Sequence, residues 1–152
     1  MERRIPVMPW PARLLTLSLL LASLPAFANE RLVLIASVDS EVEQLDSLEI
    51  RKLFLGMTVT RNSGRLRPLL NDSDVQMRNV FLQNVVSMTD TVYDRRILRL
   101  AMAGETNLPP RYTDKAALLS AVAANKLAIS YAWARDVERD KRFKILRTLW
   151  HD

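Results

Sequence analysis

The distribution of apolar and polar positions divides residues 29–152 into segments typical of alternating strands and helices. Continuous apolar runs at Arg31–Val38 and Leu127–Ala132 contain β-branched residues and are bounded by polar ones, which is typical of buried strands. Phe143–Leu149 predicts a final strand, and residues 57–70 predict strand, turn and strand around Asn62-Ser63-Gly64. The alternation predicts an α/β fold with a mixed or mostly parallel sheet, whose strand order the pattern leaves open.

Helices are predicted between these strands from apolar spacing and from end signals. The first helix is expected to bury Leu48, Leu53 and Phe54, and the third to turn Tyr93 and Ala101 inward. The predicted boundaries, in chain order, are Asp46 or Ser47 to Gly56, Asp74 to Met88, a Ser87–Asp90 capping box to Gly104, and Thr113 to Asn125. A short helical segment follows over residues 133–141, and Pro109-Pro110 requires a loop.

The first 28 residues have the pattern of a secretory signal peptide. Arg3, Arg4 and Arg13 flank or precede the apolar run Leu14–Leu24, and Ala26-Phe27-Ala28 forms a cleavage site. This run is shorter than the roughly 20 residues of a membrane-spanning helix. We therefore expect cleavage after Ala28, one periplasmic domain over residues 29–152, and no stable membrane insertion afterwards.

Composition narrows the classes of function. The leader holds three of the 22 basic and one of the 17 acidic residues, so the remainder carries a net charge of +3. This modest charge and the expected export argue against a nucleic-acid partner. The chain has no cysteine, which excludes disulfides and a lipoprotein anchor.

The side chains needed for catalysis are scarce. The single histidine, His151, lies next to the C-terminus, and there is no nucleophile elbow or glycine-rich phosphate loop. Asp72 and Asp74 lie close together, but acids at a helix start are more often caps than catalysts. We therefore expect a non-catalytic protein without a cofactor or a metal site.

The helix start within Leu70–Leu82 is the strongest candidate for ligand binding. Exposed amides at a helix start favour anions, and Arg78 in the first turns could pair with an oxyanion. On the next helix, Arg95 and Arg99 share a face; they either meet an oxyanion or form a solvated face paired with acids such as Asp94.

Several segments, in order, resemble those of periplasmic phosphate-binding proteins. Residues 47–69 resemble the family stretch L-S-x-x-E-L-x-x-I-F-x-G-K-x-T, residues 78–81 its R-x-x-F helix, and residues 127–134 its G-A-I-G-Y-V strand. The matching positions are Leu48, Leu53, Phe54, Gly56, Thr60, Arg78, Phe81, Ala128, Ile129 and Tyr131. The resemblance implies a type II periplasmic-binding-protein fold, of which this chain has room for one small lobe.

The resemblance also implies a small oxyanion such as phosphate as ligand, with Ser47, Ser73, Asp74 and Arg78 as binding residues. The family's D-G-S-G-T phosphate loop is replaced here by Asn71-Asp72-Ser73-Asp74-Val75, which adds carboxylates and removes glycines. A carboxylate about 4 Å from one unit of negative charge on the ligand costs roughly 4 kcal/mol at an effective dielectric near 20, and a dianion carries two such units. Two hypotheses follow: a solute-binding module for phosphate or a related anion, or a ligand-free domain that contacts a protein partner in the envelope.

Overall fold

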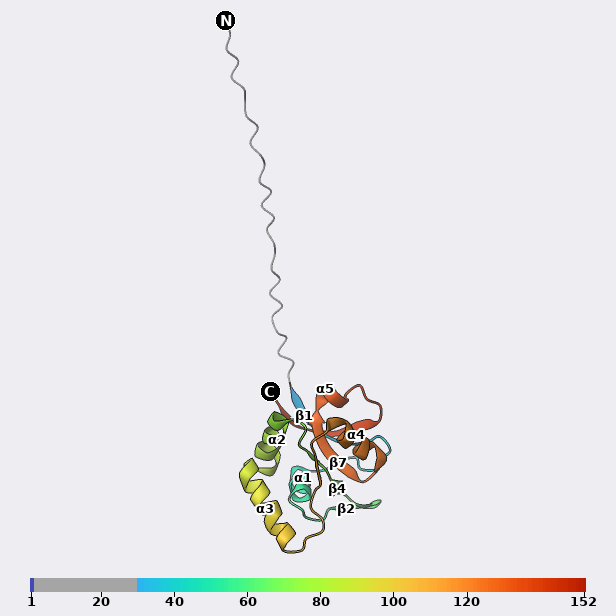
Figure 1. The fold of residues 1–152 in the computed structure, drawn as a ribbon. Helices are drawn as coiled ribbons and strands as arrows, with labels where there is room; N and C mark the ends of the chain where they lie inside the picture. The colour runs from blue at the N-terminus through green and yellow to red at the C-terminus, as the bar shows by residue number, and fades with distance from the viewer. Residues whose placement is uncertain (2–29) are drawn as a thin grey trace.

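The computed structural model describes Met1 and residues 30–152 (Figure 1). The signal peptide and its cleavage site, predicted from the sequence, lie outside the described residues. Among the described residues, no helix is both long enough and apolar enough to cross a bilayer. All the helices and strands described below, and the core that they form, fall within residues 31–151.

A four-stranded mixed sheet forms the centre of the fold, in the order β4-β7-β1-β8. Its strands are β4 (Arg67–Pro68), β7 (Ala128–Trp133), β1 (Arg31–Ser37) and β8 (Phe143–His151). β1 pairs antiparallel with both β7 and β8, whereas β4 pairs parallel with β7. The α/β class and the mixed sheet are therefore confirmed, and the alternative of a mostly parallel sheet is wrong.

The helices cover both faces of this sheet, which explains the continuous apolar runs of β1 and β7 (Figure 1). Leu32, Leu34 and Tyr131 face one core with α1 (Ser47–Phe54), α2 (Val75–Phe81) and α3 (Asp90–Met102). Val33 and Ile35 face the second core with α4 (Lys115–Ala124) and α5 (Ala134–Val137). The remaining strands are short: β2 (Thr60–Arg61) pairs with β3 (Gly64–Arg65), and β5 (Leu70–Asn71) with β6 (Arg111–Tyr112).

Helix ends differ from the sequence predictions in identifiable ways. Asp46 rather than Ser47 is the N-cap of α1, with a full capping box to Glu49. The predicted Ser87–Asp90 capping box is wrong: Thr89 is the N-cap of α3 and makes no side-chain cap bond. Asp114, not Thr113, caps α4.

The helix that begins at Val75 also ends differently from the prediction. After Phe81 it continues as a π-helix, Leu82–Val86, and stops at Ser87, whose φ of 61° is left-handed. Two residues predicted to face the core do not: Leu48 is 58% exposed, and Ala101 is exposed on α3. Phe54 and Tyr93 are buried as expected.

Candidate functional site at the start of helix α2

Asn71 fixes the chain where β5 leads into α2. Its side chain is 1% exposed; its Nδ2 donates to the Tyr131 carbonyl at 2.9 Å, and its own carbonyl accepts from the Tyr131 hydroxyl at 3.2 Å. Tyr131 in turn stacks on Phe81, with ring centroids 3.7 Å apart. The stretch Asp72-Ser73-Asp74 therefore begins at a buried residue that is hydrogen-bonded to β7 of the central sheet.

Ser73 and Asp74 both direct their polar atoms back onto this junction. The Ser73 hydroxyl donates to Asn71 Oδ1 at 2.6 Å. Asp74 is the N-cap of α2: its Oδ1 accepts from the Met77 N–H at 2.9 Å, and its Oδ2 accepts from the Trp133 indole at 3.0 Å. The bond from Met77, aided by the one from Trp133, lowers the pKa of Asp74. Both side chains are thus engaged in holding α2 to the sheet.

Arg78 lies one turn further along α2 and is bound by carboxylates from the turn before α2 and from α3. Its Nη1 donates to Asp72, its Nε donates to Asp90 at 2.5 Å, and its Nη2 donates to Asp94 at 2.8 Å. The Arg78 side chain is 8% exposed and that of Asp72 is 12% exposed, whereas Asp90 and Asp94 are about half exposed. The guanidinium that an oxyanion would need is therefore already surrounded by the protein's own acids.

Arg111 of β6 completes this cluster. It pairs with Asp94 and, at 3.4 Å, with Asp72. Two arginines and three aspartates thus give the cluster a net charge of −1. Burial alone would lower the pKa of Arg78, but the hydrogen bonds to Asp90 and Asp72 outweigh it and raise that pKa further above its ordinary value.

Sequence reasoning missed three members of this cluster: Asp90, Asp94 and Arg111. Asp90 and Asp94 are i,i+4 neighbours on α3, and this spacing was the one available signal for a shared acidic face. Nothing local connects that face to Arg78, because the contact depends on how α3 packs beside α2. The sequence alone offers Asp94 as a partner for the arginines of its own helix.

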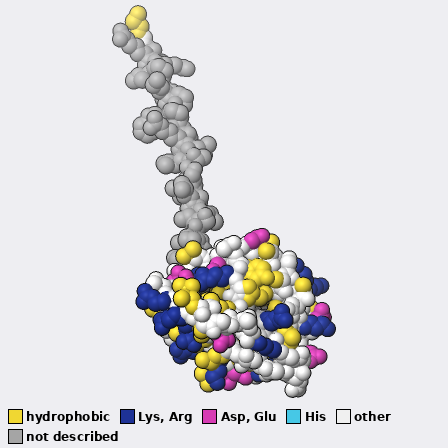
Figure 2. Space-filling model, turned by 60° about the horizontal axis from the view of Figure 1, so that its bottom comes forward, with side chains coloured by type: hydrophobic (Ala, Val, Ile, Leu, Met, Phe, Trp, Pro, Cys, Tyr) yellow, Lys and Arg dark blue, Asp and Glu magenta, His cyan; other side chains and the backbone are white. Residues whose placement is uncertain are grey.

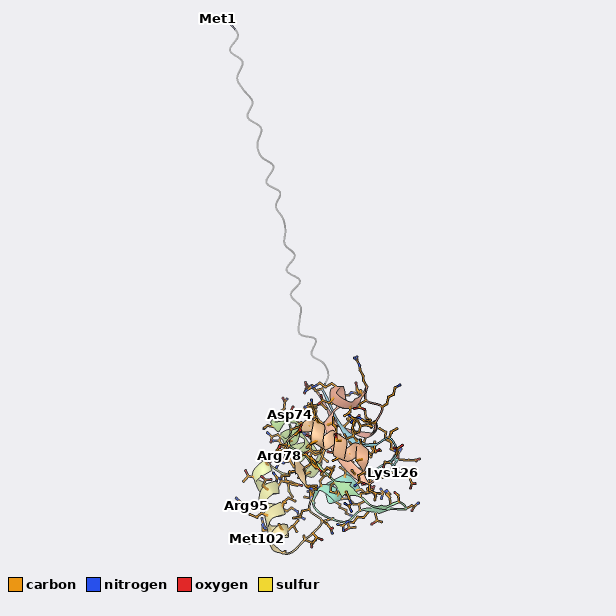
Figure 3. The ribbon with its side chains drawn as sticks, turned by 45° about the vertical axis from the view of Figure 1, so that its right-hand side comes forward. Met1, Asp74, Arg78, Arg95, Met102 and Lys126 are labelled. Carbon is orange, nitrogen blue, oxygen red and sulfur yellow. The ribbon has the colours of Figure 1, made fainter. Side chains whose placement is uncertain are left out.

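The other predicted basic and polar residues stand apart from the cluster. Ser47 is the first residue of α1, is exposed, and forms no hydrogen bond with the cluster. Arg95 and Arg99 form no ion pair with a described residue, so the predicted pairing with Asp94 does not occur. Figure 3 shows Arg95 and Met102 further along α3, away from Asp74 and Arg78.

The fold has counterparts among solved structures. It matches an ABC-type phosphate transport receptor from Vibrio cholerae with a TM-score of 0.57 at 12% identity, covering 78% of this chain and 46% of that one. It also matches a possible phosphate binding protein from Planctomyces limnophilus with a TM-score of 0.53 at 13% identity, covering 78% of this chain and 41% of that one. No protein-family model and no curated protein matches the chain.

These likenesses show the periplasmic-binding-protein-like fold that the sequence predicted. The chain spans less than half the length of the two structures. One of these structures is of a transport receptor and the other of a possible binding protein. At 12% and 13% identity, these comparisons show the fold, and membership of the phosphate-binding family stays a prediction.

Proposed function

We propose that this protein is an exported, non-catalytic, solute-binding-protein-like module of the periplasm that acts through contact with another protein of the envelope. The observation that carries this proposal is the engagement of Arg78 by Asp72, Asp90 and Asp94. In this arrangement the Asp72 carboxylate takes the bond that a bound oxyanion would take. The fold supports a solute-binding-protein-like module. Because carboxylates already occupy the Arg78 guanidinium, a function that does not depend on a free anion is favoured.

For phosphate to reach Arg78, the nearly buried Asp72 must leave the guanidinium, and its carboxylate must then find water or another partner. Asp90 and Asp94 would then repel the incoming dianion, at a cost of roughly 4 kcal/mol for each pair of unit charges 4 Å apart at an effective dielectric near 20. Ser73 cannot compensate while its hydroxyl donates to Asn71.

A second function, binding of phosphate or a related oxyanion as in an ABC-transporter substrate-binding protein, is favoured by one observation. Arg78 retains the position in the α2 helix that the family motif gives its arginine, and it lies next to the helix start (Figure 3). In this second function, Ser73, Asp74 and Arg78, with Ser47, would form the site after Asp72 has moved away.

Calorimetry with inorganic phosphate at low salt separates the two functions. For purified residues 29–152, the first function predicts no saturable heat at millimolar phosphate. It also predicts that cross-linking in cells captures a specific envelope protein. Saturable heat that Arg78→Met abolishes would support the second function and overturn the first. Asp72→Asn serves as the matched variant, because it removes the blocking charge and keeps the side-chain shape.

A further inference from the structure

A pocket of about 400 Å³ lies on a different part of the molecule from the Arg78 cluster. It is bordered by the chain from β3 into β4, by the loop between α3 and β6, and by α4. None of the residues proposed for the oxyanion site lines it. Its volume is within the range of about 300–1,000 Å³ that is usual for small-molecule sites.

The charged side chains of this pocket are all basic. Arg65 and Arg67 line it, both are exposed, and no described acidic residue pairs with either. No Asp or Glu is among the residues that line the pocket. Lys126, labelled in Figure 3, follows α4 and is exposed, and the backbone carbonyl of its neighbour Leu127 accepts the Arg67 N–H at 2.8 Å. The pocket therefore favours an anion.

Uncharged donors and an apolar base accompany these arginines. Asn125 also lines the pocket: its Oδ1 accepts the Leu127 N–H at 2.9 Å, and its Nδ2 forms no hydrogen bond with a described residue. Leu66, Pro68 and Leu69 are buried and supply apolar surface beneath the arginines. Figure 2 brings the underside of Figure 1 forward, and that face carries dark-blue basic, yellow hydrophobic and magenta acidic side chains.

We propose that this pocket binds a small organic anion, with a carboxylate or phosphate group held by Arg65 and Arg67 and a compact apolar body against Leu66, Pro68 and Leu69. Paired guanidiniums suit such anionic groups because each can donate two parallel hydrogen bonds. The apolar base adds binding that a bare inorganic ion cannot use. This site goes beyond the proposed function and does not depend on Arg78.

The test is an NMR titration of residues 29–152 with phenyl phosphate, benzoate and neutral benzyl alcohol as probes. We expect saturable shifts of the Asn107 and Asn125 side-chain amides with at least one of the two anions, and at least tenfold weaker binding of the alcohol. Shifts with phenyl phosphate alone assign the phosphate group, and shifts with benzoate alone assign the carboxylate. The absence of saturable shifts with either anion, or equal binding of benzyl alcohol, overturns the proposal.

Variants locate the binding. The double variant Arg65→Gln/Arg67→Gln should bind the anion at least tenfold more weakly. The matched double variant Arg95→Gln/Arg99→Gln on α3 should bind it with unchanged affinity. Equal loss in both pairs would show a general charge effect and overturn the site. All four arginines are exposed, so circular dichroism should confirm that each variant folds. If a variant does not fold, the comparison of the three probes on the unmodified protein still decides the proposal. If inorganic phosphate shifts the signals of Asp72 and Arg78 instead, that result contradicts the proposed function and leaves this pocket unaffected.

Discussion

Replacing Arg78 by Met should destabilise the protein strongly, because it leaves the Asp72 carboxylate nearly buried without its main partner. Met keeps the apolar stem of the side chain, so the variant isolates the loss of charge from the loss of packing. Arg78 is 8% exposed and Asp72 is 12% exposed. Asp90 and Asp94, which are about half exposed, regain water when the guanidinium is removed and contribute little.

The magnitude follows from the burial of this pair. Removing one partner of a buried ion pair costs about 3–5 kcal/mol. Arg111 stays 3.4 Å from Asp72 and offsets part of the loss, which places the expected cost near the lower limit, about 3 kcal/mol. For a domain of this size, that loss lowers the melting temperature by roughly 10 °C.

Urea unfolding followed by circular dichroism measures this cost, with Arg95→Met as the matched control. Arg95 is exposed and has no acidic partner among the described residues, so its replacement should change the free energy of unfolding by less than about 0.5 kcal/mol. Combining Arg78→Met with Asp72→Asn should restore much of the stability, because the buried carboxylate is then gone. Surface substitutions usually change the free energy of unfolding by no more than about 0.5 kcal/mol. If Arg78→Met lies within that margin of the control, the Arg78–Asp72 pair does not stabilise the fold as stated.

Two further predictions concern the helix starts. Asp46→Ala should lower the free energy of unfolding by about 1 kcal/mol because it removes the capping box with Glu49, whereas Ser47→Ala should lower it by less than about 0.5 kcal/mol. Chemical unfolding of the two variants measures both values, and equal losses would contradict the assignment of Asp46 as the cap. Because the folded pKa of Asp74 lies below its ordinary value of 3.8, its contribution is present above that pH and is lost as the pH falls through the folded pKa. The free energy of unfolding of Asp74→Asn should therefore fall less between pH 6 and pH 3 than that of the unmodified protein, and an equal fall would exclude this role.

The elements of this fold could be predicted wherever a local signal is sufficient. The apolar runs located β1 and β7 to within one residue, and Gly56 and Gly104 end their helices with φ of 82° and 84°, as the C′ pattern indicates. The signals failed where neighbouring residues compete for one role. Asp114 caps α4 although Thr113 precedes it, because Asp114 Oδ1 accepts the Ala116 N–H at 3.0 Å.

The candidate site was predictable only in part, for a physical reason. Asp74 and Arg78 stand on one helix, so their spacing shows that they are neighbours. The acids that surround Arg78 come from the turn before α2 and from α3, and Arg111 comes from β6. Such a cluster is created by packing between elements distant in sequence, and periodicity within each element carries no record of it.

If Asp72 fills the place of an oxyanion at Arg78, phosphate should reach the guanidinium only when the Asp72 charge is removed. The Arg78 Nε–H signal in a ¹⁵N–¹H spectrum during titration with inorganic phosphate tests this for the unmodified protein and for Asp72→Asn. We expect the signal to stay unchanged at millimolar phosphate in the unmodified protein and to move on titration in Asp72→Asn. A saturable movement of this signal in the unmodified protein would show that Asp72 does not exclude phosphate from Arg78.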